Sequence, residues 1–148
     1  MTPSQASLPP RLAEIIADFQ LAEGREKLDL LLEYAESLPP LPGWLARRAG
    51  QMEKVEECMT PVNVFAVTKK GRMQFYFDIP PQSPTVRGYA ALLSEGLREA
   101  TPEQVLQIPS DFYMQMGLHQ VLTSQRLNGI AAILAHMKSL ALKEITKK

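Results

Sequence analysis

The spacing of hydrophobic residues changes along the chain and divides it into helical and extended segments. Near the N-terminus apolar residues recur every three or four positions, over residues 12–19 and again over 28–35, which predicts two amphipathic helices. The Pro9-Pro10 pair is typical of a helix start. We expect residues 1–10, which are polar and carry prolines, to form a flexible arm.

The middle of the chain has a strand-like pattern instead. Residues 62–68 are rich in valine and phenylalanine and residues 73–79 in aromatics, with a Lys-Lys-Gly turn between them, which predicts a β-hairpin. Alternation along the strands places about half of the aromatic side chains on one face, where core packing explains them. Because two strands alone are marginal, a third is expected, from residues 45–57 or elsewhere. The LPPLPGW segment (38–44) predicts an extended connector.

Helical spacing returns after the hairpin and continues to the C-terminus. Four local signals mark the expected helix starts: Ser83-Pro84, the capping-box segment Thr101 to Gln104, Pro109-Ser110-Asp111, and Thr123 or Ser124. Gly117 is the expected end of the third of these helices. Helices, then a hairpin, then helices predict an α+β fold in which a small antiparallel sheet packs against helices.

Composition and charge narrow the range of partners. The chain has 148 residues, enough for one domain over residues 1–148, and its 16 basic and 16 acidic residues balance. A neutral chain has no broad positive field, so nucleic acid is not an expected partner. No apolar run reaches the ~20 residues that span a bilayer, and no secretory signal is visible. We therefore expect a cytoplasmic protein without membrane contact.

The only cysteine, Cys58, lies in the segment KVEECMTPVNVFAVT (54–68), on a proline-bounded corner before the hairpin. A free cysteine is commonly a small buried hydrophobe. A thiol on a loop can instead be a nucleophile, if its surroundings favour the thiolate. Glu56 and Glu57 oppose this, because neighbouring anions raise the pKa of a thiol. The residues alone leave both interpretations open.

Groups that could assist such a thiol are distant in the sequence. Arg87 and Arg126, each near a predicted helix start, are the candidate cations, and His119 is the imidazole that a Cys-His enzyme would use. Asn128 and Gly129 are unfavourable in an early helical turn and indicate close packing or a polar role. A capped helix start and a surface arginine would explain the same residues.

Two further inferences concern this part of the chain. Gly88 lies inside a predicted helix and indicates the close approach of another backbone. The soft metal ligands, Cys58, His119 and His136, have no zinc-binding spacing, and no GxGxxG or P-loop sequence is present. Neither a metal nor a nucleotide cofactor is expected.

Four stretches of the chain together resemble the SufE/CsdE family, the sulfur-acceptor proteins of iron–sulfur cluster assembly. They are LPPLPGW at 38–44, V-x-x-C at 55–58, VRGYAALL at 86–93 and GLHQVLTSQRLNGI at 117–130. The last is similar to the family signature G-L-x-x-x-L-[ST]-x-x-R-x-N-G, whose length and fixed order make chance a poor explanation. The resemblance covers nearly the whole chain.

The resemblance implies a role for Cys58. It would accept persulfide sulfur from a SufS-like, PLP-dependent cysteine desulfurase, stimulate that enzyme and deliver the sulfur to a SufBCD-like scaffold. PLP would belong to the partner, and this chain, a monomer or homodimer, would bind no cofactor. The implied fold is a small sheet with helices, as in IscU-type scaffolds. The residues expected to support the thiol are Arg126, Asn128, Gly129, His119, Arg87, Glu57 and Thr60.

The segment around the thiol departs from the commoner family pattern V-x-G-C-Q-S. Glu57 precedes Cys58, Met59 and Thr60 follow it, and PPQSP (80–84) stands where many members have Asp-Ser-Asp. Two other classes of function stay open. One is a Cys-His thiol enzyme, a hydrolase or peroxidase, that uses Cys58 with His119. The other is an interaction module in which Cys58 is part of the core.

Overall fold

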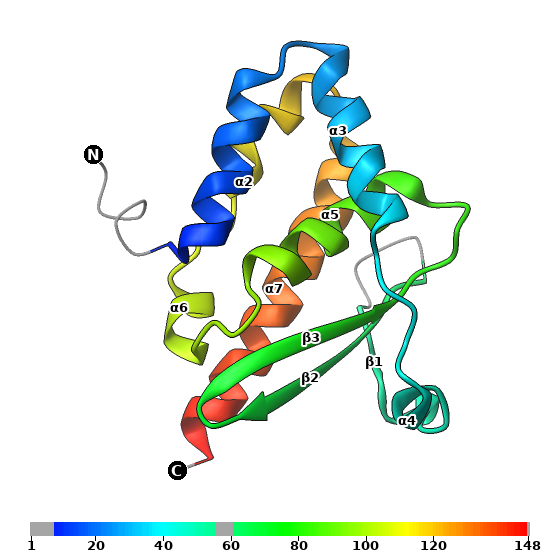
Figure 1. Cartoon of the computed structure of the whole chain (residues 1–148), viewed down its shortest axis with the longest axis vertical. Coiled ribbons are helices and arrows are strands. Elements are labelled where there is room, and N and C mark those ends of the chain that lie inside the picture. Colours follow the sequence, from blue (N-terminus) through cyan, green and yellow to red (C-terminus); the bar gives the residue numbers. More distant parts are fainter. Residues whose placement is uncertain (1–7, 56–60, 148) are drawn as a thin grey trace.

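The computed structural model describes residues 8–55 and 61–147. Helices and a three-stranded antiparallel sheet form an α+β fold, which confirms the predicted fold class (Figure 1). The α-helices are α2 (Pro10–Leu21), α3 (Arg25–Glu36), α4 (Gly43–Ala46), α5 (Pro84–Gly96), α6 (Pro102–Leu106) and α7 (Ser124–Thr146). The strands are β1 (Glu53–Lys54), β2 (Asn63–Lys69) and β3 (Arg72–Asp78), and three 3-10 turns are η1 (Ala49–Gln51), η2 (Phe112–Met114) and η3 (Leu118–Gln120).

The two N-terminal helices form as the periodicity predicts. The apolar stripe of α2 is buried: Leu12, Ile15, Ile16 and Phe19. Pro10 is the first residue of this helix, and Leu8 is only 8% exposed in the core. Residues 8–10 of the expected arm are therefore part of the folded domain, while residues 1–7 lie outside the described part of the chain.

The sheet has the order β1-β2-β3, and the predicted hairpin forms its larger part. Phe65 of β2 pairs with Tyr76 of β3, and the alternation turns Phe75 and Phe77 towards the core, where they are buried. The third strand comes from residues 45–57, one of the two sources expected: Glu53 of β1 pairs with Val64 of β2.

Helix α5 is the central helix of the molecule and packs against α2, α3 and α7 (Figure 1). It begins at the expected start after Ser83, and its apolar residues are buried at helical spacing: Val86, Tyr89, Ala90 and Leu93, followed by Leu97. The expected close approach at Gly88 is confirmed, because an added Cβ would lie 2.1 Å from the backbone oxygen of Leu31 on α3. Only glycine allows the two backbones to lie this close.

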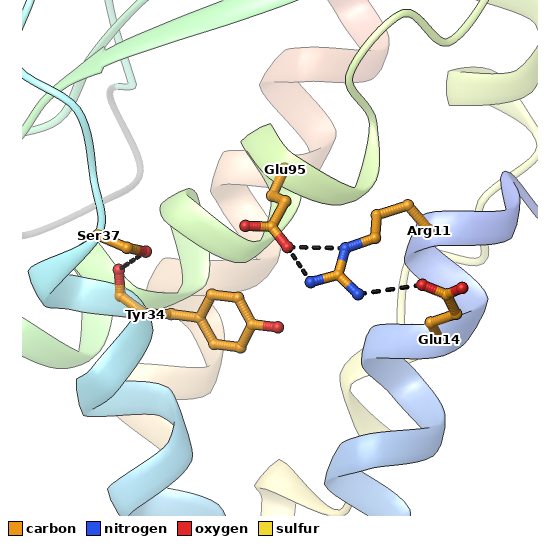
Figure 2. A network of polar contacts seen from close by, with 5 residues as sticks. All are labelled: Arg11, Glu14, Tyr34, Ser37 and Glu95. Atoms are coloured by element: carbon orange, nitrogen blue, oxygen red, sulfur yellow. Dashed lines mark hydrogen bonds and ion pairs between the residues drawn. The ribbon is translucent and has the colours of Figure 1, made fainter.

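A polar network on the surface joins α2 to α5 (Figure 2). Arg11 of α2 donates to Glu95 of α5 at 2.7 Å and to Glu14 at 3.1 Å. The hydrogen bond that Arg11 donates to the carboxylate of Glu95 raises the pKa of Arg11 above its ordinary value. Burial raises the pKa of Tyr34 on α3, whose ring points towards Arg11, and the charge of Glu95 adds to the shift. Because these ion pairs are exposed to solvent, they contribute little to stability.

Two local predictions are wrong. The helix expected from Pro109 to Gly117 is only the 3-10 turn η2, because backbone amides between Phe112 and Gly117 donate to carbonyls three residues back and not four. The turn η2 ends at Met114, whereas Gly117, the expected end, has a φ of 76° in the left-handed region and precedes η3. The extended connector stops at Pro42, and Gly43 and Trp44 begin the single turn α4.

Candidate functional site

The ends of the segment that carries the only cysteine are held together by one backbone contact. The amide of Val55 donates to the carbonyl of Val62 at 2.9 Å, and both side chains are 0% exposed. Cys58, Glu57 and Thr60 lie between them in residues 56–60, outside the described part of the chain. The contact fixes where this segment leaves and rejoins the fold, at one end of the sheet. We call this the loop end.

Arg87 belongs to the loop end. Its Nη1 donates to the carbonyl of Ile79 at 2.6 Å, directly after β3. The register places Asn63, the first residue of β2, opposite Asp78, the last residue of β3. The side chain of Arg87 therefore ties the first turns of α5 to the end of the sheet at which residues 56–60 are attached.

Arg126 is held against the start of the same helix. Its Nη1 donates to the hydroxyl of Thr85 at 2.6 Å, and Thr85 is only 7% exposed. The backbone amide of Arg126 donates to the hydroxyl of Thr123 at 3.3 Å, which confirms Thr123 as the N-cap of α7. The N-termini of α5 and α7 are thus joined by a side-chain hydrogen bond between residues 41 positions apart.

The other expected site residues have different environments. Gly129 is buried at the start of α7, as expected for close packing, whereas Asn128 beside it is exposed. His119 is exposed on η3, and it forms no hydrogen bond or ion pair with another residue of the described part of the chain. The structure therefore joins Arg87 and Arg126 to the loop end but brings no described partner to His119.

Two features of the site were missed from the sequence. Thr85 lies inside the SPTVRG segment, and only its burial against Arg126 reveals its importance. Glu53 of β1 contacts α7 through His136 at 3.0 Å and Lys143 at 3.5 Å, just before the buried Val55. No sequence signal indicates this second contact, because its partners lie more than 80 positions away.

Charges of both signs lie near the described part of the loop end. The guanidinium groups of Arg87 and Arg126 lie at the first turns of α5 and α7, whose free amides carry partial positive charge. Asp78 places one carboxylate at the end of β3. Within residues 8–55 and 61–147 no group of three His, Cys, Asp or Glu side chains has the arrangement of a metal site. None of the helices described is long and apolar enough to cross a membrane.

This geometry defines an α+β domain in which the segment with the only thiol is attached at the end of a small sheet, and Arg87 ties that end to the first turns of α5. Comparison with known proteins shows the family to which this domain belongs. The family model SufE, described as an Fe-S metabolism associated domain, matches residues 13–141. A SufE-like protein of Mycobacterium tuberculosis is 42% identical over 134 residues, which cover 90% of this chain and 92% of that protein.

Two further relatives agree with this match. A SufE-like protein of Synechocystis is 32% identical over 142 residues, which cover 94% of this chain and 85% of that protein. The solution structure of a hypothetical protein from Thermus thermophilus superposes with a TM-score of 0.82 at 36% identity, covering 94% of this chain and 98% of that one. The chain belongs to the SufE family, and its role lies in iron–sulfur metabolism.

Proposed function

We propose that the protein is a sulfur acceptor and carrier, which takes persulfide sulfur from a cysteine desulfurase onto Cys58. The observation that carries the proposal is the hydrogen bond between Val55 and Val62, since it places the ends of the only thiol-bearing segment at the loop end. Membership of the SufE family and the cations at that end support it. The acceptor role requires only the one cysteine.

The transfer is a thiol exchange reaction at sulfur. The thiolate of Cys58 attacks the outer sulfur of the donor's persulfide, so that a new S–S bond forms on Cys58. The S–S bond of the donor breaks, and the donor cysteine leaves as a thiolate, which takes up the proton that Cys58 lost. The number of S–S bonds does not change, so the step needs no added oxidant or reductant.

A single cysteine suits a carrier for a chemical reason. A second cysteine nearby would attack the Cys58 persulfide, release the sulfur as sulfide and close a disulfide. With only one cysteine in the chain, this route is closed. The sulfur then stays bound until an acceptor thiol of another protein takes it.

The reaction needs a persulfide donor and a recipient, and membership of the SufE family implies which proteins these are. The donor is a SufS-like cysteine desulfurase, in which PLP supplies the chemistry that removes sulfur from cysteine, and removal of its persulfide by Cys58 stimulates its turnover. The recipient is a SufBCD-like scaffold on which the iron–sulfur cluster is built. The chain itself holds no cofactor in this scheme.

Incubation with a SufS-like desulfurase, PLP and cysteine tests the proposal. We expect the intact mass of the protein under non-reducing conditions to rise by one sulfur atom, and alanine to form faster than with the desulfurase alone. Cys58→Ser should remove both effects. A wild-type protein that gains no sulfur and leaves alanine formation unchanged would refute the carrier function.

A further inference from the structure

The sheet has a second side that the core does not use. Alternation turns Phe65 and Tyr76 away from the core as a directly opposite pair, followed by Val67 opposite Gln74 and by Lys69 opposite Arg72. The same side also carries Asn63 opposite Asp78 at the loop end. We call the six positions beyond that pair, together with Trp44, the outer sheet face. It is distinct from the loop end, because it runs along the strands to the hairpin turn at Lys70.

Part of the outer sheet face is an exposed aromatic cluster. The ring of Trp44 on α4 meets Tyr76 edge-on at a centroid distance of 5.6 Å and Phe65 at 6.1 Å. Trp44 nevertheless remains 40% exposed. The three rings therefore form an aromatic surface and not an extension of the buried core. Aromatic residues are enriched where proteins bind one another.

Next to the aromatic cluster is a hollow with a positive rim. It has a volume of about 450 Å³ and is lined by Val67, Lys69, Lys70, Arg72, Met73, Gln74, Tyr76 and Glu99. Among residues 8–55 and 61–147, no carboxylate forms an ion pair with Lys69, Lys70 or Arg72. Arg72 donates instead to the backbone carbonyl of Glu99 at 3.0 Å, a neutral acceptor.

We propose that the outer sheet face binds an acidic segment of a partner protein. An apolar side chain of that segment would lie against Trp44 and Tyr76, and its carboxylates would face Lys69, Lys70 and Arg72. Charge complementarity supports this occupant, since three cations stand at the rim with only the carboxylate of Glu99 among them. A nucleic acid or an anionic bilayer gains affinity with the number of charges neutralised, and a chain of net charge +0 offers few.

The charged rim of the face lies far from the end of the sheet at which the thiol-bearing segment is attached. Lys69 lies six residues along β2 from Asn63 at the loop end, a distance of about 20 Å in an extended strand. The aromatic part is nearer, because Phe65 and Tyr76 lie two residues from Asn63 and Asp78. The inference goes beyond the proposed function and does not depend on it.

Trp44 makes the proposal directly measurable, because it is the only tryptophan of the chain. The probe is a short synthetic peptide in which glutamate alternates with leucine around one phenylalanine. We expect a saturable change in tryptophan fluorescence, with NMR shifts at the amides of Val67, Gln74 and Tyr76. Lys69→Glu with Lys70→Glu should weaken binding about tenfold, since each rim charge contributes up to about a factor of five.

The matched control is Arg25→Glu with Lys138→Glu, which changes the net charge equally at positions on α3 and α7 that line neither the rim nor the pocket beside Phe65. It should bind the peptide as the wild type does. Three results would overturn the proposal: no saturable signal, an equal response to a peptide with glutamine in place of glutamate, or equal weakening by both double variants. Tighter binding to anionic phospholipid vesicles or to a single-stranded oligonucleotide would also overturn the assignment to a protein partner.

Discussion

The hydroxyl of Thr85 joins the starts of α5 and α7. It is buried and accepts a 2.6 Å hydrogen bond from Arg126, so two helix N-termini that are distant in the sequence meet at one contact. A hydrogen bond to a charged group is stronger than one between neutral groups. Loss of the acceptor would leave the guanidinium of Arg126 without this partner and the α5–α7 contact weaker.

Thr85→Val should therefore destabilise the protein by about 2 kcal/mol, because valine has the shape of threonine but accepts no hydrogen bond. The free energy of unfolding from urea titration measures the effect. Thr85→Ser keeps the hydroxyl and should retain most of the stability. If the valine variant unfolds at the same urea concentration as the serine variant and the wild type, the hydrogen bond between Arg126 and Thr85 does not contribute to stability.

Tyr89 gives a prediction about pH. Its side chain is fully buried on α5, and within the described part of the chain its hydroxyl has no hydrogen-bond partner. Burial raises the pKa of Tyr89 well above its ordinary value, and nearby Tyr113 adds to the shift. The unfolded chain therefore loses this proton near pH 10, about its ordinary pKa, while the folded protein keeps it. Stability should fall as the pH rises above that value.

Tyr89→Phe removes the proton and the unpartnered hydroxyl together. We expect the variant to be about 1 kcal/mol more stable than the wild type at neutral pH. Above pH 10 the difference should grow by up to about 1.4 kcal/mol for each pH unit. Urea titrations of both proteins between neutral and alkaline pH measure it, and curves that stay parallel would contradict the prediction.

The acids beside the thiol give a third prediction at this scale. We expect Glu56 and Glu57 to keep the resting thiol of Cys58 protonated until a partner docks, because neighbouring anions oppose the thiolate. Changing both to glutamine should lower the pKa of the Cys58 thiol. The rate of alkylation by iodoacetamide as a function of pH measures this pKa, and an unchanged profile would exclude a role for the acid pair.

At the scale of elements, the contact between α3 and α5 leaves no room for a side chain at position 88. Gly88 lies so close to the carbonyl of Leu31 that the helices would have to separate to admit a side chain. The α2–α3 pair and the first turns of α5 would then shift together. This packing, rather than any chemistry, explains the glycine of the VRGYAALL segment.

Gly88→Ala should cost about 3 kcal/mol of stability, although alanine favours a helix by about 1 kcal/mol over glycine. Gly50→Ala is the control, because no atom lies within 4 Å of an added Cβ there. Its unfolding free energy should stay within about 0.5 kcal/mol of the wild type. Equal stabilities of the two variants would show that α3 and α5 are not in close contact in solution.

The elements also show what the hydrophobic pattern predicts and where it fails. Long periodic segments such as α2, α5 and the hairpin are confirmed, since burial of one face dictates both the pattern and the structure. The Pro109–Gly117 segment fails because local signals for a helix start and end do not show whether the backbone between them closes α-helical or 3-10 hydrogen bonds. The two-residue β1 has no pattern of its own and forms through its pairing with β2.

At the scale of the molecule, the sequence predicts the members of the loop end but not their contacts. Their positions near helix starts make Arg87 and Arg126 candidates, and the structure ties Arg87 to the end of the sheet and Arg126 to α5. Their partners follow only from tertiary packing: the carbonyl of Ile79 from the packing of α5 against β3, and the hydroxyl of Thr85 from the packing of α5 against α7. Contacts between residues 41 positions apart leave no trace in local periodicity.

The whole molecule is thus organised around two ends of one small sheet. The segment with Cys58 is attached at the loop end through Val55 and Val62, and the hairpin turn lies about 20 Å away along β2. The proposed carrier function needs a thiol that a partner protein can reach. The central claim is that Cys58 itself receives the sulfur.

The most direct test identifies which residue carries the transferred sulfur. The protein is incubated with a SufS-like desulfurase and ³⁴S-labelled cysteine, alkylated without reduction, digested with trypsin and mapped by mass spectrometry. We predict one labelled sulfur on the peptide of residues 55–69, bound to Cys58, and none elsewhere. A desulfurase that turns over in the presence of this protein and leaves residues 55–69 unlabelled would contradict the account.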